Sequence, residues 1–524
     1  MRLKKIKFLA IALFLVGTIK AATIFTLPIE KNELWWLGVI NHAIMQPLSE
    51  GYQANLYANC YGNQAQPLLL SNTGKYIWSA EPFEIEVRND SLFLSKPYGE
   101  FVFKKAGLTL RDAYMGASRE FFPPSGKMPD MLMFQQPQYN TWIELLYDQN
   151  QDDVLKYANG ILGNGLPPGV IMIDDNWQED YGNWKFHPQR FPNPKQMIDS
   201  LHQKGFKVML WICPFISPDS EIGRKLESEN LVLKSAAGGT KIVNWWNGYS
   251  TVLDLSKPQA VSWFESRLNE LQNEYGIDGF KFDAGDPEFY LDGIDSTGIN
   301  PNYQTELFCR LGINYPLNEY RAAWRMGGQP LAQRLRDKGH NWADLQTLIP
   351  GIVLQGLMGY PFTCPDMIGG GEMGSFLDLR KIDQELIVRS AQCHAFMPMM
   401  QFSVAPWRIL DEEHFGAVKA AVALREKFIG EILKLSQEAA RSGEPVIRSL
   451  EYVFPNGNYE KVADQFLIGN TIMVAPFLDT LAFRNVVIPE GKWIDDRGKV
   501  FIGPRTIKIS SELNRVPYYI KKEK

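Results

Sequence analysis

Short segments in which apolar and polar residues alternate fill the chain between residues 23 and 130. They lie at 76–78, 83–87, 92–94 and 101–103, and Asn-Asp and Pro-Tyr-Gly breaks separate them. A period of two predicts antiparallel strands that bury one face. Because the strands are short and closely spaced, we predict an N-terminal β-sandwich domain over residues 23–130.

The pattern changes over residues 131–435. Largely apolar runs at 169–173, 205–212 and 279–283 alternate with amphipathic stretches at 194–204 and 260–275, and 359–363 and 397–403 are further strand candidates. Buried strands that alternate with helices predict parallel βα units. The length suits an α/β catalytic domain of the (β/α)₈ TIM barrel type. A doubly wound sheet is the alternative, but no GxGxxG or GxxxxGK[ST] motif follows any predicted strand.

The last part of the chain returns to short strand-like pieces. A helix at 415–435 is predicted to close the barrel, and strands are predicted at 452–454, 465–468, 472–476 and 485–488. We therefore predict a C-terminal β-sandwich domain over residues 436–524.

The first residues have the pattern of a secretory signal peptide. Basic residues at positions 2, 4, 5 and 7 precede an apolar run from Phe8 to Val16, and Ala21 and Ala22 follow. This order predicts cleavage near residue 22 and export to the periplasm or the extracellular space. A membrane anchor is the alternative, but the run is short of the roughly 20 residues that span a bilayer. We expect no membrane span in the mature chain.

Composition and charge narrow the range of partners. Of the 524 residues, 45% are hydrophobic and 22% charged, which is ordinary for a globular protein. The formal charge of −5 would become −10 without residues 1–22, and an acidic protein is a poor ligand for nucleic acid. The five cysteines are scattered and show neither a disulfide framework nor a CxxC metal motif. We expect no metal and no cofactor, and the sequence leaves the oligomeric state open.

Acidic residues follow several of the predicted strands. Asp174 and Asp175 end one strand, Asp283 ends another, and Asp366 follows a third. In a TIM barrel the carboxyl ends of the strands form the active site. Acids beside tryptophans suit a sugar, which has hydroxyl edges and an apolar face. The predicted partner is therefore an oligosaccharide or glycoside, with two tryptophans among the candidate contacts: Trp211, for which core packing is the alternative, and Trp246.

Asp283 is the sharpest candidate. Lys281 lies two positions earlier, so both side chains leave the strand on the same side. A neighbouring cation lowers the pKa of a carboxyl, and an ionised carboxylate is what a glycosidic nucleophile requires. The small residues Ala284 and Gly285 are predicted to leave room for substrate. The alternative is a buried Lys–Asp pair that only fixes the strand end. Asp286 is expected to cap the following turn, and binding of a sugar hydroxyl is the alternative.

A retaining mechanism needs a second carboxyl about 5–5.5 Å from the nucleophile, protonated at rest. A charged Asp283 would raise the pKa of such a neighbour. Spacing alone does not choose among Asp174, Asp337 and Asp366.

Four motifs resemble glycoside hydrolase family 31. Residues 279–286, Gly-Phe-Lys-Phe-Asp-Ala-Gly-Asp, resemble its nucleophile motif, and 336–345 its acid/base region. Residues 366–371 are similar to its Asp-Ile-Gly-Gly motif, and 173–177 to its first-strand motif. The resemblance covers about 165–410 and is closest to an α-galactosidase-like branch. It implies that Asp283 is the nucleophile and Asp337 the acid/base, and that the following residues contact the sugar: Asp174, Asp175, Arg325 and Asp366.

The chain departs from the α-glucosidases of that family within the sugar pocket. Arg-Asp-Lys at 336–338 replaces the common Gly-Asp-Asn, the stretch from 325 to 337 is shorter, and no histidine follows the last strand at 400–407. We predict a secreted, retaining exo-α-glycosidase that hydrolyses terminal α-galactosides through a covalent glycosyl-enzyme. Alternatives within the family are an α-glucosidase, an α-xylosidase or a transglycosylase. The alternative from another class is a non-catalytic carbohydrate-binding protein.

Overall fold

The structure, a computed structural model, describes residues 23–97, 99–294 and 300–522. The predicted signal peptide lies outside these ranges. None of the helices within them is long and apolar enough to cross a membrane.

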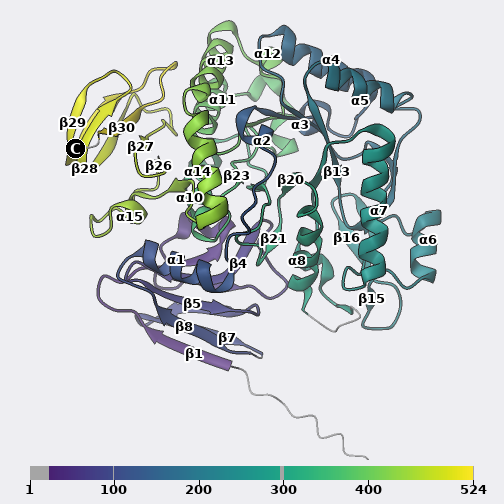
Figure 1. The fold of residues 1–524 in the computed structure, drawn as a ribbon, viewed down its shortest axis with the longest axis horizontal. Coiled ribbons are helices and arrows are strands. Elements are labelled where there is room, and N and C mark those ends of the chain that lie inside the picture. Colours follow the sequence, from purple (N-terminus) through teal and green to yellow (C-terminus); the bar gives the residue numbers. More distant parts are fainter. Residues whose placement is uncertain (1–22, 98, 295–299, 523–524) are drawn as a thin grey trace, which may run out of the picture.

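Two antiparallel sheets form the N-terminal domain (Figure 1). The first has the order β1-β7-β6-β3 and the second β2-β4-β5-β8. Their facing sides enclose a core around Trp35 and Leu69, while α1 packs on the opposite side of the second sheet. Strands β2, β4 and β5 are therefore buried on both faces, as their burial patterns show. The elements are β1 (Thr23–Pro28), β2 (Trp35–Val39), η1 (Ile40–Met45), β3 (Gln53–Asn55), β4 (Gln64–Ser71), β5 (Lys75–Ser79), β6 (Glu84–Arg88), β7 (Ser91–Lys96), β8 (Phe101–Lys105) and α1 (Leu110–Phe121).

Eight parallel strands form the central barrel, which confirms the predicted TIM barrel with β domains on either side. The order is β9-β10-β13-β18-β20-β22-β23 with β24 beside β9, and a parallel bridge between Met367 and Gln401 links the two ends. The strands are β9 (Gln138–Asn140), β10 (Val170–Ile173), β13 (Lys207–Ile212), β18 (Gly279–Phe282), β20 (Leu317–Tyr320), β22 (Gln333–Arg334), β23 (Thr363–Cys364) and β24 (Gln401–Phe402).

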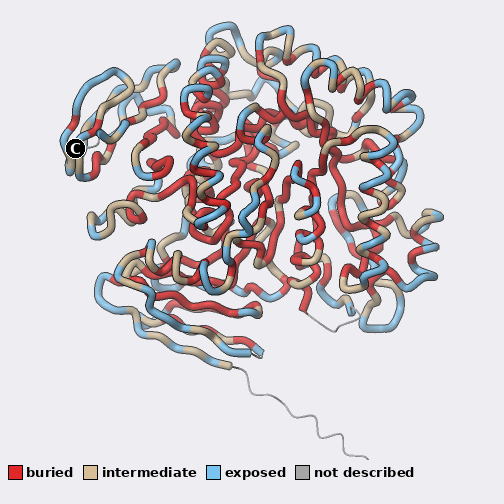
Figure 2. The backbone as a smooth tube through the Cα atoms, viewed as in Figure 1, coloured by how far each residue is buried: buried red, intermediate tan, exposed pale blue. Residues whose placement is uncertain are grey.

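Helices surround the barrel (Figure 1). The largest group of buried residues lies between these helices and the barrel strands, at the centre of the molecule (Figure 2). The helices α5 and α7 match the helices predicted at 194–204 and 260–275. Both begin with proline, which is favoured in the first turn of a helix. The helices are α2 (Leu132–Gln135), α3 (Trp142–Leu145), α4 (Gln151–Gly163), α5 (Pro194–Gln203), α6 (Glu221–Ser228), α7 (Pro258–Tyr275), α8 (Pro301–Gly312), α9 (Trp342–Gln346), α10 (Leu348–Leu357), α11 (Gln384–His394) and α12 (Pro406–Ile409).

The loops that connect the barrel strands and helices contain small sheets and short 3₁₀ helices. One three-stranded sheet, β14-β17-β16, follows β13, and β21 pairs in parallel with β4 of the N-terminal domain. The elements are β11 (Gln178–Asp180), β12 (Asn183–Phe186), β14 (Phe215–Ile216), β15 (Lys234–Ser235), β16 (Ile242–Trp245), β17 (Gly248–Val252), η2 (Pro287–Tyr290), β19 (Gly293–Ile294), β21 (Ala323–Trp324), η3 (Met373–Phe376) and η4 (Leu379–Lys381).

The closing helix predicted at 415–435 is two helices, α13 (Glu412–Glu426) and α14 (Ile429–Ser442). The chain turns at Phe428, whose ring lies 4.8 Å from that of Phe396 and 5.0 Å from that of Tyr518. Phe428 thus packs its ring at the junction of the two helices, and the prediction of one continuous helix is wrong.

The C-terminal strands form one six-stranded sheet, β25-β26-β27-β30-β28-β29, rather than the two sheets that a sandwich requires. Its core surrounds Trp493. The strand predicted at 452–454 is also wrong, because most of it lies in helix α15, whose first turn is capped by Ser449. The elements are β25 (Ile447–Arg448), α15 (Leu450–Val453), β26 (Phe466–Ile468), β27 (Ile472–Val474), β28 (Phe483–Asp495), β29 (Val500–Ser510) and β30 (Tyr518–Lys522).

Candidate active site

A cavity of about 480 Å³ opens at the carboxyl ends of the barrel strands. Its size is typical of a small-molecule site. It brings together seven of the nine residues that the sequence singles out. The lining residues are Gly62, Trp142, Tyr147, Asp174, Asp175, Trp211, Trp246, Lys281, Asp283, Asp286, Glu288, Phe289, Arg321, Arg336, Asp337 and Met373.

Asp283 follows β18 and points its carboxylate into this cavity. Its Oδ1 accepts hydrogen bonds from Arg321 Nε at 2.9 Å and from the Ala284 amide at 2.8 Å. Its Oδ2 accepts one from Trp211 Nε1 at 3.0 Å. A carboxylate with three donors is preorganised in its charged form.

Electrostatics also keep Asp283 ionised. Burial acts to raise the pKa of Asp283, but the positive charges of Arg321, Lys281 and Arg334 overcome it and hold that pKa well below its ordinary value. The Trp211 hydrogen bond acts in the same direction. The predicted neighbour Lys281 contributes at longer range, because its Nζ donates to Asp174 Oδ2 at 2.6 Å. The cation in direct contact with Asp283 is Arg321.

Asp337 lies at the rim of the same cavity, with its side chain 41% exposed. Arg334, at the end of β22, donates through Nη1 to Asp337 Oδ1 at 2.6 Å and to Asp366 Oδ1 at 2.7 Å. A Cβ on Gly371 would lie 3.0 Å from both of these carboxylate oxygens, so the third glycine after Asp366 gives the two acids room to meet at one arginine.

Asp366 is fully buried and does not line the cavity. Besides Arg334, the amide of Lys338 donates to its Oδ2 at 2.8 Å. Burial, opposed by Arg334, raises the pKa of Asp366 to about 7. The carboxyl therefore lies behind the wall that carries Asp337 and supports it through the shared arginine.

Asp174 and Asp175 follow β10 and form the opposite wall. Asp174 pairs with Lys281, and both side chains are almost completely buried. Asp175 accepts hydrogen bonds from Asn247 Nδ2 at 2.5 Å and from the Tyr181 hydroxyl at 3.2 Å. Burial raises the pKa of Asp175 to about 7, and the neighbouring charge of Asp174 adds to the rise. Asp174 also accepts from the Asp175 amide at 2.9 Å, so both acids of this wall are held by hydrogen bonds at the cavity surface.

Two tryptophans predicted to contact sugar both line the cavity but in different ways. Trp211 lies in β13, is buried, and fixes Asp283 through its indole N–H. Trp246 lies in the turn between β16 and β17, is 49% exposed, and has its ring 5.8 Å from the Arg321 guanidinium carbon. Trp246 is thus the apolar surface that a ligand can cover.

The structure does not bring Arg325 to the cavity. Its Nε donates to Glu306 at 2.8 Å and its Nη1 to the Ala80 carbonyl. Arg321, four residues earlier and directly after β20, lies beside Asp283 instead. The residue after a barrel strand is the expected site position, and this signal would have identified Arg321 had β20 been recognised.

Two local predictions about the 283–286 turn are wrong. A Cβ on Gly285 would lie 2.6 Å from the ring of Phe308, so this glycine serves packing rather than substrate access. Asp286 makes no side-chain cap of η2, because both of its oxygens accept from Arg321, at 2.9 and 2.6 Å.

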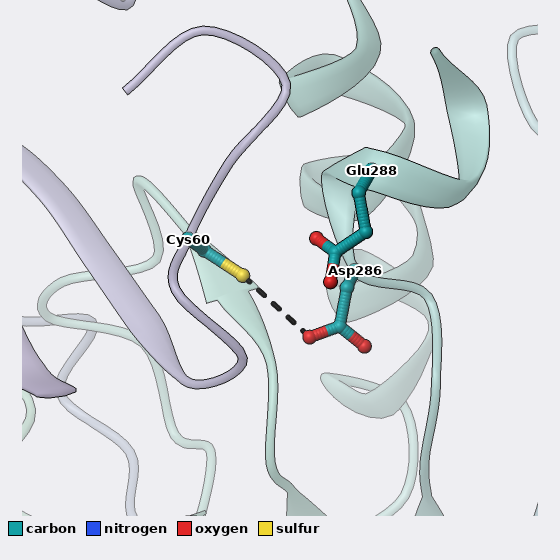
Figure 3. Close-up of side chains that lie close together, drawn as sticks. All are labelled: Cys60, Asp286 and Glu288. Atoms are coloured by element: carbon teal, nitrogen blue, oxygen red, sulfur yellow. Dashed lines mark hydrogen bonds between the residues drawn. The ribbon is translucent and has the colours of Figure 1, made fainter. Parts of the chain in front are cut away.

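One group of potential metal ligands occurs among the described residues: Cys60, Asp286 and Glu288 (Figure 3). The Cys60 thiol points to Asp286 Oδ1 at 3.8 Å. Asp286 already binds the Arg321 guanidinium with both oxygens, and burial raises the pKa of the Cys60 thiol well above its ordinary value. Because metals bind the thiolate, this cluster is better described as the support of Arg321 than as a metal centre.

The arrangement supports nucleophilic and acid–base chemistry. One carboxylate, Asp283, is held ionised on the cavity floor, and a second carboxyl, Asp337, reaches solvent at the rim. Such a pair can attack a polarised carbon and exchange a proton with a leaving group.

Family models match two parts of the chain. Residues 131–307 match the model described as "Glycosyl hydrolases family 31 TIM-barrel domain", and 443–524 the "Glycosyl hydrolase family 31 C-terminal domain". Among curated relatives, the "Myogenesis-regulating glycosidase" of Mus musculus is 32% identical over 398 residues, which are 73% of this chain and 55% of that protein. "Alpha-glucosidase 2" of Bacillus thermoamyloliquefaciens is 25% identical over 513 residues, 90% of this chain and 62% of the relative. The chain therefore spans less than two thirds of the length of these relatives.

Solved structures share the fold. A family 31 dextranase of Flavobacterium johnsoniae in complex with glucose has a TM-score of 0.84 at 20% identity, covering 96% of this chain and 66% of that one. A family 31 α-xylosidase from a soil metagenome in complex with xylose has a TM-score of 0.83 at 20% identity, covering 96% and 79%. The names of these four proteins do not mention galactose, so the α-galactosidase-like branch stays a prediction.

Proposed function

We infer that this chain, whose barrel and C-terminal domain match those of glycoside hydrolase family 31, is a retaining exo-acting α-glycosidase. One observation carries the proposal: Asp283, held ionised by Arg321 and Trp211, shares a cavity with the solvent-exposed carboxyl of Asp337. A retaining mechanism requires these two roles on one sugar.

The reaction follows in two displacements. Asp283 attacks the anomeric carbon, the glycosidic C–O bond breaks, and protonated Asp337 gives its proton to the leaving oxygen. Asp337, now a carboxylate, takes a proton from water, whose oxygen attacks the anomeric carbon and releases Asp283. Asp174 and Lys281 offer an acceptor and a donor to hydroxyls of the reacting sugar, and bonds that tighten in the transition state accelerate the reaction.

For the sugar we propose a terminal α-galactoside. The support is in the sequence: Arg336 and Lys338 flank Asp337, and no histidine follows β24 within 403–407. Arg336 lines the cavity, so this departure from the α-glucosidase pattern lies where a substrate binds. The relatives and structures named above favour α-glucosides or α-xylosides as the second candidate.

A panel of 4-nitrophenyl α-glycosides tests this proposal. We expect nitrophenol release from the galactoside, with the α-anomer formed first when the product is followed by NMR. Release from the glucoside or xyloside alone would refute the α-galactoside and assign that sugar as the substrate. A β-anomer as the first product would refute the retaining mechanism. Sugar binding by calorimetry without turnover of any glycoside would favour a carbohydrate-binding protein.

We also propose that the protein is exported and cleaved near residue 22, as its first residues predict. N-terminal sequencing of the protein recovered from a secreting host tests this. A mature chain that begins at Met1 would overturn cleavage.

A further inference from the structure

The two arginines of the active site rest on the N-terminal domain. Arg321 Nη1 donates to the carbonyl of Gly62 at 2.8 Å, across 259 positions of the chain. Gly62 and the next two residues lead into β4, which pairs in parallel with β21 just after Arg321 (Figure 1). Gly62 of the N-terminal domain therefore contributes to the wall of the cavity.

The next two side chains hold the backbone of both arginines. Asn63 Nδ2 donates to the carbonyl of Arg321 at 3.0 Å and to that of Arg334 at 3.1 Å. Gln64 Nε2 donates to the same two carbonyls, at 2.5 and 2.8 Å. Both amides are almost completely buried, and the two bonds to the Arg334 carbonyl form away from competing water.

Gln64 is itself oriented. Gln355 Nε2, from α10, donates to Gln64 Oε1 at 2.8 Å, which turns the Gln64 NH₂ group toward the arginine carbonyls. We call the side chains of Asn63 and Gln64 the amide clamp. The amide clamp ties the turn after β20 and the end of β22 to the start of β4 in the N-terminal domain.

We propose that Asn63 and Gln64 are positioning residues for catalysis, which set the geometry of Arg321 at Asp283 and of Arg334 at Asp337. The inference rests on the proposed function. Errors of about 1 Å at reacting groups cost up to about 100-fold in rate, and the clamp fixes the two backbones from which both guanidiniums reach the carboxyls.

The effect of the amide clamp can be measured through the pKa of Asp283, which depends on the charges around it. The groups that face Asp283 are Arg321, Lys281, Arg334 and the Trp211 indole, and burial alone raises its pKa. A displaced Arg321 therefore lets the pKa of Asp283 rise, whereas a mere loss of domain packing leaves it low.

Gln64→Met and Gln66→Met form a matched pair of variants. Both positions lie in β4 and are fully buried. The Gln66 amide oxygen accepts from the Tyr360 hydroxyl at 3.2 Å, and no described contact joins the Gln66 side chain to either arginine. Both variants therefore make the same change of side chain at a buried position of the same strand. Only Gln64→Met removes hydrogen bonds to the arginine carbonyls.

We expect Gln64→Met to lower kcat about 10- to 100-fold with little change in KM. Its Asp283 should titrate at least one pH unit higher, followed by NMR of protein labelled with carboxyl-¹³C aspartate and assigned with Asp283→Asn. Gln66→Met should leave this titration unmoved and should lower the melting temperature less, because the Gln66 side chain makes one described hydrogen bond and that of Gln64 makes three. The milder variant Asn63→Ser should shift it in the same direction as Gln64→Met.

Equal effects of Gln64→Met and Gln66→Met on kcat and on the Asp283 titration would overturn the proposal. A wild-type protein that hydrolyses no glycoside in the panel would refute the proposed function. The NMR titration would still decide whether the clamp sets the Asp283–Arg321 geometry, because it does not depend on turnover.

Discussion

Alanine variants of Asp283 and Asp337 separate the two catalytic roles. Neither change should unfold the protein. Asp337 is 41% exposed, and when it is removed the buried guanidinium of Arg334 keeps its ion pairs with Asp366 and Glu319. When Asp283 is removed, Arg321 keeps both bonds to Asp286 and remains neutralised.

The expected losses of activity differ with the leaving group. General acid catalysis contributes about 10²- to 10⁴-fold, or about 3–5 kcal/mol of an activation barrier. In kcat/KM, which reports formation of the covalent intermediate, Asp337→Ala should lose this on a phenyl glycoside but little on a glycosyl fluoride, whose leaving group needs no proton. The kcat for the fluoride should still fall, because Asp337 is also the base that activates water in the second displacement. Asp283→Ala should lose activity on both, since the covalent step itself is gone.

Azide tests the assignment by stereochemistry. In Asp337→Ala, azide attacks the covalent intermediate in place of water and should give the α-glycosyl azide. In Asp283→Ala, azide enters the space left by the nucleophile and should give the β-glycosyl azide. Both products are identified by NMR. Asp278→Asn, at the opposite end of the same strand and bound to His202, is the control and should keep wild-type turnover.

The reasoning fails if both variants form the same anomer. It also fails if Asp337→Ala hydrolyses a phenyl glycoside at the wild-type rate, because the rim carboxyl would then transfer no proton.

Three further predictions concern the cavity wall. Because burial raises the pKa of Asp175 to about 7, the folded state keeps a proton that the unfolded state loses above about pH 4, so stability falls as pH rises toward 7. Asp175→Asn should flatten this decline in thermal unfolding between pH 4 and 8, and an unchanged slope would contradict the cause. Trp246→Ala should raise KM about 2- to 10-fold with an unchanged melting temperature, since the ring is half exposed and lines the cavity; an unchanged KM would exclude it from binding. Lys281→Met should cost about 3–5 kcal/mol in urea unfolding because it leaves Asp174 buried without a partner. Added Asp174→Asn should restore part of this stability, and a double variant no more stable than the single one would refute the pairing.

The local pattern of apolar and polar residues predicts several strands and helices of the barrel. The strands at 170–173, 207–212 and 279–282 are largely apolar, and the helices at 194–203 and 258–275 are amphipathic with proline at the start. These signals are local because side-chain period and capping depend on neighbours in the chain.

Strand β20 escaped prediction for a physical reason. Its sequence is Leu-Asn-Glu-Tyr, and Glu319 points into a polar layer inside the barrel. There Gln401 Nε2 donates to Glu319 Oε2 at 2.6 Å, and Arg334 Nε lies 3.2 Å from Glu319 Oε1. A buried polar residue is favourable only when such partners surround it, and those partners come from other strands. With β20 unrecognised, Arg321 at its end could not be identified either.

The sequence by itself determined the alternation of strands and helices, the acids at the strand ends and the resemblance that assigns Asp283 and Asp337. Tertiary structure alone decided that Arg321 rather than Lys281 touches Asp283, that Arg325 lies elsewhere, and that amides of the N-terminal domain hold the active-site arginines. The division has one cause: pattern and capping depend on residues a few positions apart, whereas these contacts join residues up to 271 positions apart, which only barrel closure and domain packing bring together.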